Sequence, residues 1–99
     1  MQKPGRGQLT EEQAEAIAIS ALGHLAGDEE ALGRFLALTG IGPADLRLAA
    51  AEPGFLVGVL EFFLEDESLL LSFASNAALR PTMIAAARFT LARGSEGNF

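Results

Sequence analysis

The amino-acid sequence predicts an all-α fold, a single orthogonal bundle of six helices, and three observations lead to that class. No segment alternates apolar and polar residues with the period of two that a half-buried strand requires, and β-branched residues are few. Glycine, proline and aspartate interrupt the apolar segments where helices would start and stop. The chain also resembles itself at an offset of 38 residues, which predicts two pseudo-symmetric three-helix units, at about residues 10–51 and 52–93.

The repeat involves helix starts and core positions rather than a chemical motif. Seven pairs are identical at this offset, and further pairs, such as Ile17 with Phe55 and Leu25 with Phe63, are apolar in both copies. Aspartate and proline at matched positions are typical of helix N-termini, so the repeat predicts architecture and no activity. The identical pairs are Asp28 and Asp66, Glu29 and Glu67, Leu22 and Leu60, Leu32 and Leu70, Phe35 and Phe73, Pro43 and Pro81, and Ala49 and Ala87.

The first unit is predicted to contain a long, a medium and a short helix. Thr10 is a good N-cap for the first, and Gly27 is expected to end it in the left-handed conformation. Asp28 caps the second helix, which Gly40 ends, and Pro43 begins the third. One face of the first helix is apolar at helical spacing, through Ala14, Ile17, Ala18, Ala21, Leu22 and Leu25.

The second unit follows the same order. A fourth helix over residues 55–64 is apolar around most of its circumference, which makes it the candidate for the centre of the fold. Asp66 caps the fifth helix, and Pro81 begins a sixth that ends near residue 93. Because an interior glycine weakens a helix, Gly58 suggests a close backbone approach, and we expect the first and fourth helices to cross near Ser20 and Gly58.

Residues 10–93 are expected to form one helical bundle domain, with residues 1–9 and 94–99 as disordered tails. The first apolar stretch follows glutamates, so no signal peptide is expected. Acidic residues interrupt the most apolar stretch, and cysteine is absent, so we expect a cytoplasmic protein with no membrane contact. The net charge of −6 opposes binding to nucleic acid and to anionic lipid.

The sequence assigns no catalytic residue, no cofactor and no metal ligand, and we expect a protein that is not an enzyme. His24 is the only histidine, and it falls away from the apolar face of the first helix, as a surface side chain would. The acidic clusters at residues 28–30 and 65–67 lack the ligand spacing of a calcium loop and have no histidine partners. Helix capping accounts for both clusters.

A helix, a tight turn and a proline-initiated helix span residues 38–48, in the manner of a helix–turn–helix motif. This order supports an alternative function, a nucleic-acid-associated regulator. The second helix of the motif offers few donors for base edges, however, and Asp45 would face phosphate. The acidic charge of the chain also disfavours this alternative.

The main functional hypothesis is a non-catalytic protein–protein interaction or self-association module. The fourth helix carries apolar residues on nearly every side, and a chain of 99 residues has few neighbours to cover them. Leftover apolar surface is typical of a homodimer face or a protein-binding face. The candidate interaction surface consists of Phe55, Leu56, Phe62, Phe63, Leu69 and Leu71.

In their order along the chain, these segments resemble a family of short bacterial all-helical proteins, Domain of Unknown Function thirty-five seventy-two. The resemblance rests on an acidic first helix followed by the segments 25–28, 34–40 and 42–46, which read Leu-Ala-Gly-Asp, Arg-Phe-Leu-Ala-Leu-Thr-Gly and Gly-Pro-Ala-Asp-Leu. It covers about residues 10–92. The resemblance implies an all-helical cytoplasmic protein and brings no activity, cofactor or functional residue.

Overall fold

The protein is all-helical in a computed structural model that describes residues 9–96. Within that range there are six α-helices, one 3-10 turn and no strand, which confirms that the fold is all-α. The elements are α1 (Glu11–Ala26), α2 (Glu29–Thr39), the 3-10 turn η1 (Pro43–Asp45), α3 (Leu46–Ala49), α4 (Pro53–Leu64), α5 (Glu67–Ala77) and α6 (Pro81–Glu96).

The helix starts are stabilised as their residue types predict. The Thr10 hydroxyl accepts a hydrogen bond from the Gln13 N–H, and the Gln13 side chain accepts one from the Thr10 N–H, both at 3.0 Å. The Asp28 carboxylate accepts from the N–H three residues later at 3.1 Å, and Asp66 does the same at 3.1 Å. Helices α4 and α6 begin with proline, whose missing N–H is not needed in a first turn.

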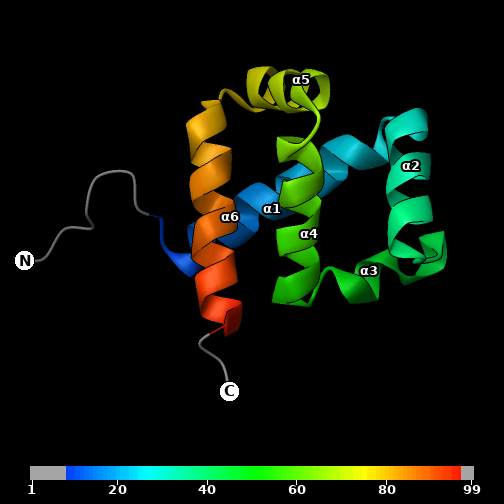
Figure 1. The fold of residues 1–99 in the computed structure, drawn as a ribbon, viewed down its shortest axis with the longest axis horizontal. Coiled ribbons are helices and arrows are strands. Elements are labelled where there is room, and N and C mark those ends of the chain that lie inside the picture. Colours follow the sequence, from blue (N-terminus) through cyan, green and yellow to red (C-terminus); the bar gives the residue numbers. More distant parts are fainter. Residues whose placement is uncertain (1–8, 97–99) are drawn as a thin grey trace, which may run out of the picture.

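Helices α2, α4 and α6 lie side by side and alternate in direction (Figure 1). The η1–α3 segment joins α2 to α4 at one end, and α5 joins α4 to α6 at the other, while α1 crosses behind α4 and α6. The shortest dimension of the molecule is 18 Å. This thickness suits two layers of helices, whose axes pack about 8–10 Å apart.

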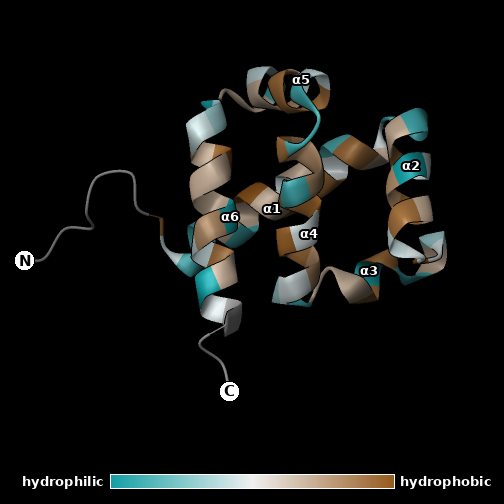
Figure 2. Cartoon of the chain, in the orientation of Figure 1, coloured by the Kyte–Doolittle hydropathy of each residue, from teal (hydrophilic) through white to brown (hydrophobic). Residues whose placement is uncertain are grey.

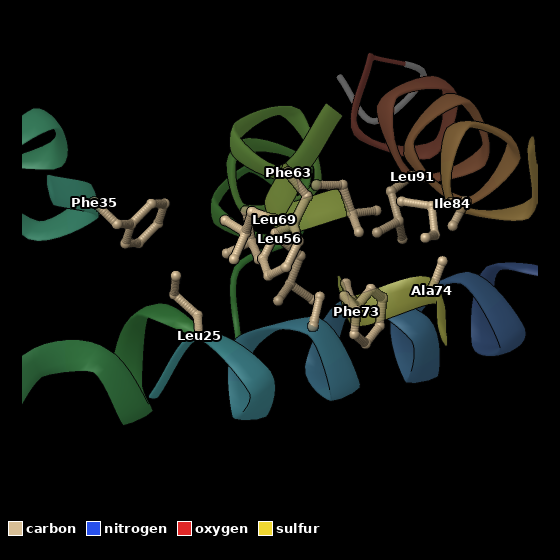
Figure 3. Packing of buried hydrophobic residues seen from close by; sticks show 14 of the residues in the cluster. Leu25, Phe35, Leu56, Phe63, Leu69, Phe73, Ala74, Ile84 and Leu91 are labelled. Atoms are coloured by element: carbon tan, nitrogen blue, oxygen red, sulfur yellow. The ribbon is translucent and has the colours of Figure 1, made fainter. Parts of the chain in front are cut away.

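Helix α4 lies at the centre of the hydrophobic core. Its Val59, Leu60 and Phe63 side chains are fully buried, and the core contains no charged or polar side chain of the described residues. Figure 3 shows Leu25 of α1, Phe35 of α2, and Ile84 and Leu91 of α6 directed toward this centre. Apolar residues occur along the whole of α4, whereas α2 alternates between apolar and polar (Figure 2).

The expected crossing of α1 and α4 near Ser20 and Gly58 is wrong. Ser20 is exposed, and a Cβ atom added to Gly58 would meet no atom within 4 Å. The close approach uses alanines instead, because Ala14, Ala18 and Ala21 of α1 are fully buried against neighbouring helices. Small side chains on one helix let two helix axes approach without any glycine.

Two predicted helix ends and one predicted tail boundary also need correction. Gly27 ends α1 in the right-handed region, at φ −87°, so its lack of a side chain is not required there. Helix α6 continues to Glu96, past the predicted end at residue 93, so residues 94–96 are helical rather than a tail. Near the N-terminus, the predicted tail includes Leu9. This residue is half-buried instead, and its carbonyl accepts a hydrogen bond from the Thr90 hydroxyl at 3.4 Å. The remaining predicted tail residues, 1–8 and 97–99, lie outside the described range.

Helix boundaries recur at the 38-residue offset. Helices α2 and α5 start and end at matched positions, and α1 and α4 end at the matched residues Ala26 and Leu64. The residue that ends α2, Gly40, is left-handed at φ 74°, and its counterpart after α5, Ala78, is left-handed at φ 56°. Alanine is rarely found in this region, because its Cβ crowds the following carbonyl.

This pair of left-handed residues yields a stability prediction with opposite signs. Ala78→Gly should raise the free energy of unfolding by about 0.5–1 kcal/mol, because glycine relieves the left-handed strain at a small entropic cost. Gly40→Ala should lower it by about 1 kcal/mol for the converse reason. Urea unfolding measures both changes. Gly33→Ala, in an open position within α2, controls for helix propensity, and a stabilising Gly40→Ala would contradict the assigned conformation.

Candidate functional site

A groove lies between α1 and the η1–α3 segment. Its volume is about 620 Å³, within the range of ligand and peptide sites. Eight of its nine lining residues are apolar, and Ile19 at its edge remains 47% exposed. The lining residues are Ile19, Leu22, Gly23 and Ala26 of α1, and Pro43, Ala44, Leu46, Arg47 and Ala50 on the other side.

The groove exists because α3 is short and because the lining residues are small. Pro53 disfavours helical conformation in the residue before it, and Glu52 is extended, so α3 ends at Ala49. The matched positions 38 residues later form the contact between α4 and α6. There Leu60 and Ile84 are fully buried, whereas their counterparts Leu22 and Leu46 are only half-buried.

Charged side chains show the same contrast between the two helix pairs. Arg88 of α6 forms a salt bridge with Glu61 of α4 at 2.7 Å, but the matched residues in the groove are Ala50 and Gly23. The one charged residue of the groove lining is Arg47. It is exposed and takes no part in either salt bridge found among residues 9–96.

A second, smaller hollow of about 160 Å³ lies between α2 and α4. Its apolar side includes Phe62 and Leu38, which is 76% exposed, and its acidic side consists of Glu61 and Glu65. Gly58 lines it, which explains why this glycine approaches no other backbone. Glu61 is already paired with Arg88, so less of the acidic charge there is free for a ligand.

The structure separates the six residues of the predicted interaction surface. Leu56, Phe63 and Leu69 are buried in the core, where no partner can contact them, because α1, α5 and α6 cover more of α4 than its sequence suggested. Phe55 and Phe62 are half-buried, and both pack edge-on against the Phe35 ring, at 5.6 and 5.3 Å. Leu71 of α5 is 49% exposed. Helical periodicity in the sequence could have predicted the α1 residues that line the groove. It could not have predicted that the η1–α3 segment lies opposite them.

The ring of His24 packs against two phenylalanines that also contact each other. Its centroid lies 5.5 Å from that of Phe73 and 6.1 Å from that of Phe63, and its Nε2 is 3.3 Å from the Ser72 hydroxyl. Ser72 lies inside α5, where backbone N–H groups bond within the helix, so none are aimed at an oxyanion. The pair forms a hydrogen bond between α1 and α5.

The acidic clusters do act as helix caps, as the hydrogen bonds to Asp28 and Asp66 show. Asp66 also joins two helices, because Arg34 of α2 donates to it at 3.0 Å while the guanidinium lies 5.3 Å from the Phe62 ring centroid. The backbone N–H of Leu69 and the Arg34 side chain hold the pKa of Asp66 below its ordinary value of 3.8. Within residues 9–96, no group of three ligating side chains is placed to hold a metal ion.

The segment expected to form a helix–turn–helix motif lacks a second helix of useful length. It forms the three-residue turn η1 and the four-residue helix α3. A recognition helix presents several residues to base edges in the major groove, and four residues make only one turn. The geometry of this segment therefore does not favour nucleic-acid binding.

The sequence of this chain matches a known family of proteins. A family model described as Protein of unknown function (DUF3572) matches residues 11–94. No curated protein matches the chain, and no solved structure does. Among the described residues, none of the helices has the length and apolar character needed to cross a membrane.

The lowered pKa of Asp66 gives a pH-dependent prediction. Because its pKa is lower in the folded than in the unfolded chain, this carboxylate stabilises the fold above about pH 4, and the contribution is lost as the pH falls further. The urea midpoint of the wild type should fall between about pH 7 and about pH 3, and that of Asp66→Asn should fall less over the same range. Arg34→Met, which keeps packing over Phe62, should reduce it in part. An unchanged pH dependence in Asp66→Asn would contradict the pairing.

Proposed function

Since this chain belongs to the family described as Protein of unknown function (DUF3572), which brings no activity with it, we propose a function from its surface. The protein acts as a non-catalytic protein–protein interaction module. Its partner is either another protein or a second copy of this chain. The cysteine-free acidic sequence supports a cytoplasmic setting.

The groove between α1 and η1–α3 is the observation that carries this proposal. Apolar side chains are stabilised when they leave water, and here Leu22 and Leu46 remain half-buried while Ile19 is exposed. A contiguous apolar hollow on a small domain is typical of a protein-binding or ligand-binding site. The single arginine in its lining would orient a partner without dominating the interaction.

The predicted internal repeat supports the proposal that this groove is the binding site. Several contacts recur when the units are exchanged at the 38-residue offset. The Phe35 ring lies 5.3 Å from Phe62, and the matched Phe73 ring lies 5.5 Å from the matched His24. Such exchanged contacts are expected of two units related by an approximate twofold axis. Within this proposal, the groove is the place where one unit lacks the long helix of the other.

The predicted surface on α4 and α5 keeps a smaller part in the proposal. Leu71 on α5 and Phe62 beside the second hollow are the members that a partner reaches most readily. These residues and the groove lie on different elements, so the proposal treats them as a secondary contact area. Self-association through either area would make the mass of the particle depend on concentration.

The proposal predicts that a filled groove abolishes binding while the fold persists. Gly23 lines the groove, and a Cβ added there would meet nothing within 4 Å, so Gly23→Leu fills the hollow without a clash. Gly33→Leu is the matched control, because Gly33 is also helical, exposed and open but lines neither hollow. Thermal unfolding should show both variants folded.

The measurement compares tagged full-length wild type with both variants in the native cell. Quantitative mass spectrometry of the purified complexes should show a protein whose recovery falls about tenfold in Gly23→Leu, as for a central interface residue, and stays unchanged in Gly33→Leu. Light scattering at several concentrations tests the second copy in the same way. Identical recoveries in all three proteins, together with an identical mass, would refute the interaction module.

A further inference from the structure

We propose that the groove between α1 and η1–α3 binds an amphipathic helix of a partner protein, with an acidic residue placed against Arg47 and a basic residue toward Glu15. This inference rests on the proposed function and adds the chemistry of the partner. Three observations support it: the groove walls are helical, several lining residues are small, and Arg47 and Glu15 carry opposite charges.

The groove has the shape and length to hold about two turns of helix. Its α1 side runs from Ile19 to Ala26 at spacings of three and four, so these residues form one stripe on that helix. Seven residues of α-helix span about 10 Å. The opposite side is also helical, and an apolar helix packs well into the furrow between two helices. Matched positions in the second unit already pack two helices tightly, at Leu60 and Ile84.

Large apolar side chains on the helix of the partner would fit the lining of the groove. Four of the nine lining residues are glycine or alanine, and these leave the hollow that larger side chains would fill. Leu22, Leu46 and Ile19 would then lose their remaining exposure to water. Leucine, isoleucine or phenylalanine at positions i, i+3 or i+4, and i+7 of the partner suits this surface.

Charge complementarity determines the polar residues of the partner. Arg47 lines the groove without a carboxylate partner among residues 9–96, and a guanidinium is suited to pairing with a carboxylate. Glu15 is exposed one turn before Ile19, so it lies on the groove side of α1 beyond the apolar stripe. A helix with one acidic and one basic residue therefore complements both charges, and its neutral charge avoids repulsion by a chain of charge −6.

Fluorescence anisotropy with synthetic labelled peptides tests this chemistry. The first peptide is a leucine-rich amphipathic helix with one glutamate and one lysine seven positions apart, and the second replaces the glutamate with lysine. Wild type should bind the first peptide roughly tenfold more tightly, even though the net charge of the protein favours the second. Arg47→Glu should reverse this preference, while Arg80→Glu, an exposed charge reversal just before α6, should leave it unchanged.

Two further measurements separate this inference from the proposed function. A third peptide with a central proline, which breaks the helix, should show no binding, and neither should Gly23→Leu with the first peptide. Equal binding of the proline peptide, or no binding of the first peptide to wild type, overturns the helical partner. If the peptides overturn the helical partner but Gly23→Leu still loses its cellular partner, the protein is an interaction module whose partner is not a helix. If Gly23→Leu retains its cellular partner as well, both proposals fail.

Discussion

The burial of α4 is the constraint on which the arrangement of the other helices depends, because eight of its twelve residues are large and apolar. One neighbouring helix can cover only one stripe of such a helix, so several are needed. Helix α1 crosses it from behind, α6 packs along it, and α5 closes one end, which brings the first and last helices of the chain together around the middle one. Leu56, Val59, Leu60 and Phe63 are buried as a result.

The same requirement explains why the last helix of the first predicted unit is shorter than the last helix of the second. In the second predicted unit the long helix α6 covers α4, with Ile84 and Leu60 both fully buried and Arg88 in a salt bridge with Glu61. The first unit needs no such cover for α1, because α4 and α6 already bury its alanine stripe. Its third helix therefore stops before Pro53 without exposing the main core, and the side of α1 around Ile19 remains open. The proposed binding groove is thus available without loss of core packing.

Part of the candidate site could be predicted from the sequence, and part could not. An apolar stripe on α1 that includes Leu22 follows from helical periodicity, and so does the surplus of apolar surface in the chain as a whole. Periodicity says which residues share a face, but not which element opposes that face. The predicted surface therefore included Leu56, Phe63 and Leu69, which other helices cover, and missed Leu46 and Arg47, which lie opposite α1 only after the chain folds.

Local signals determined the helices of this protein, since caps and prolines act on backbone groups within a few residues. Thr10, Asp28, Asp66 and Pro81 mark helix starts in the sequence, and each lies at one in the structure. Only the tertiary structure decided which helices touch. Contacts such as those of Arg34 with Asp66, and of His24 with Phe73, join residues far apart in the chain. They depend on the mutual packing of whole helices, which no local pattern specifies.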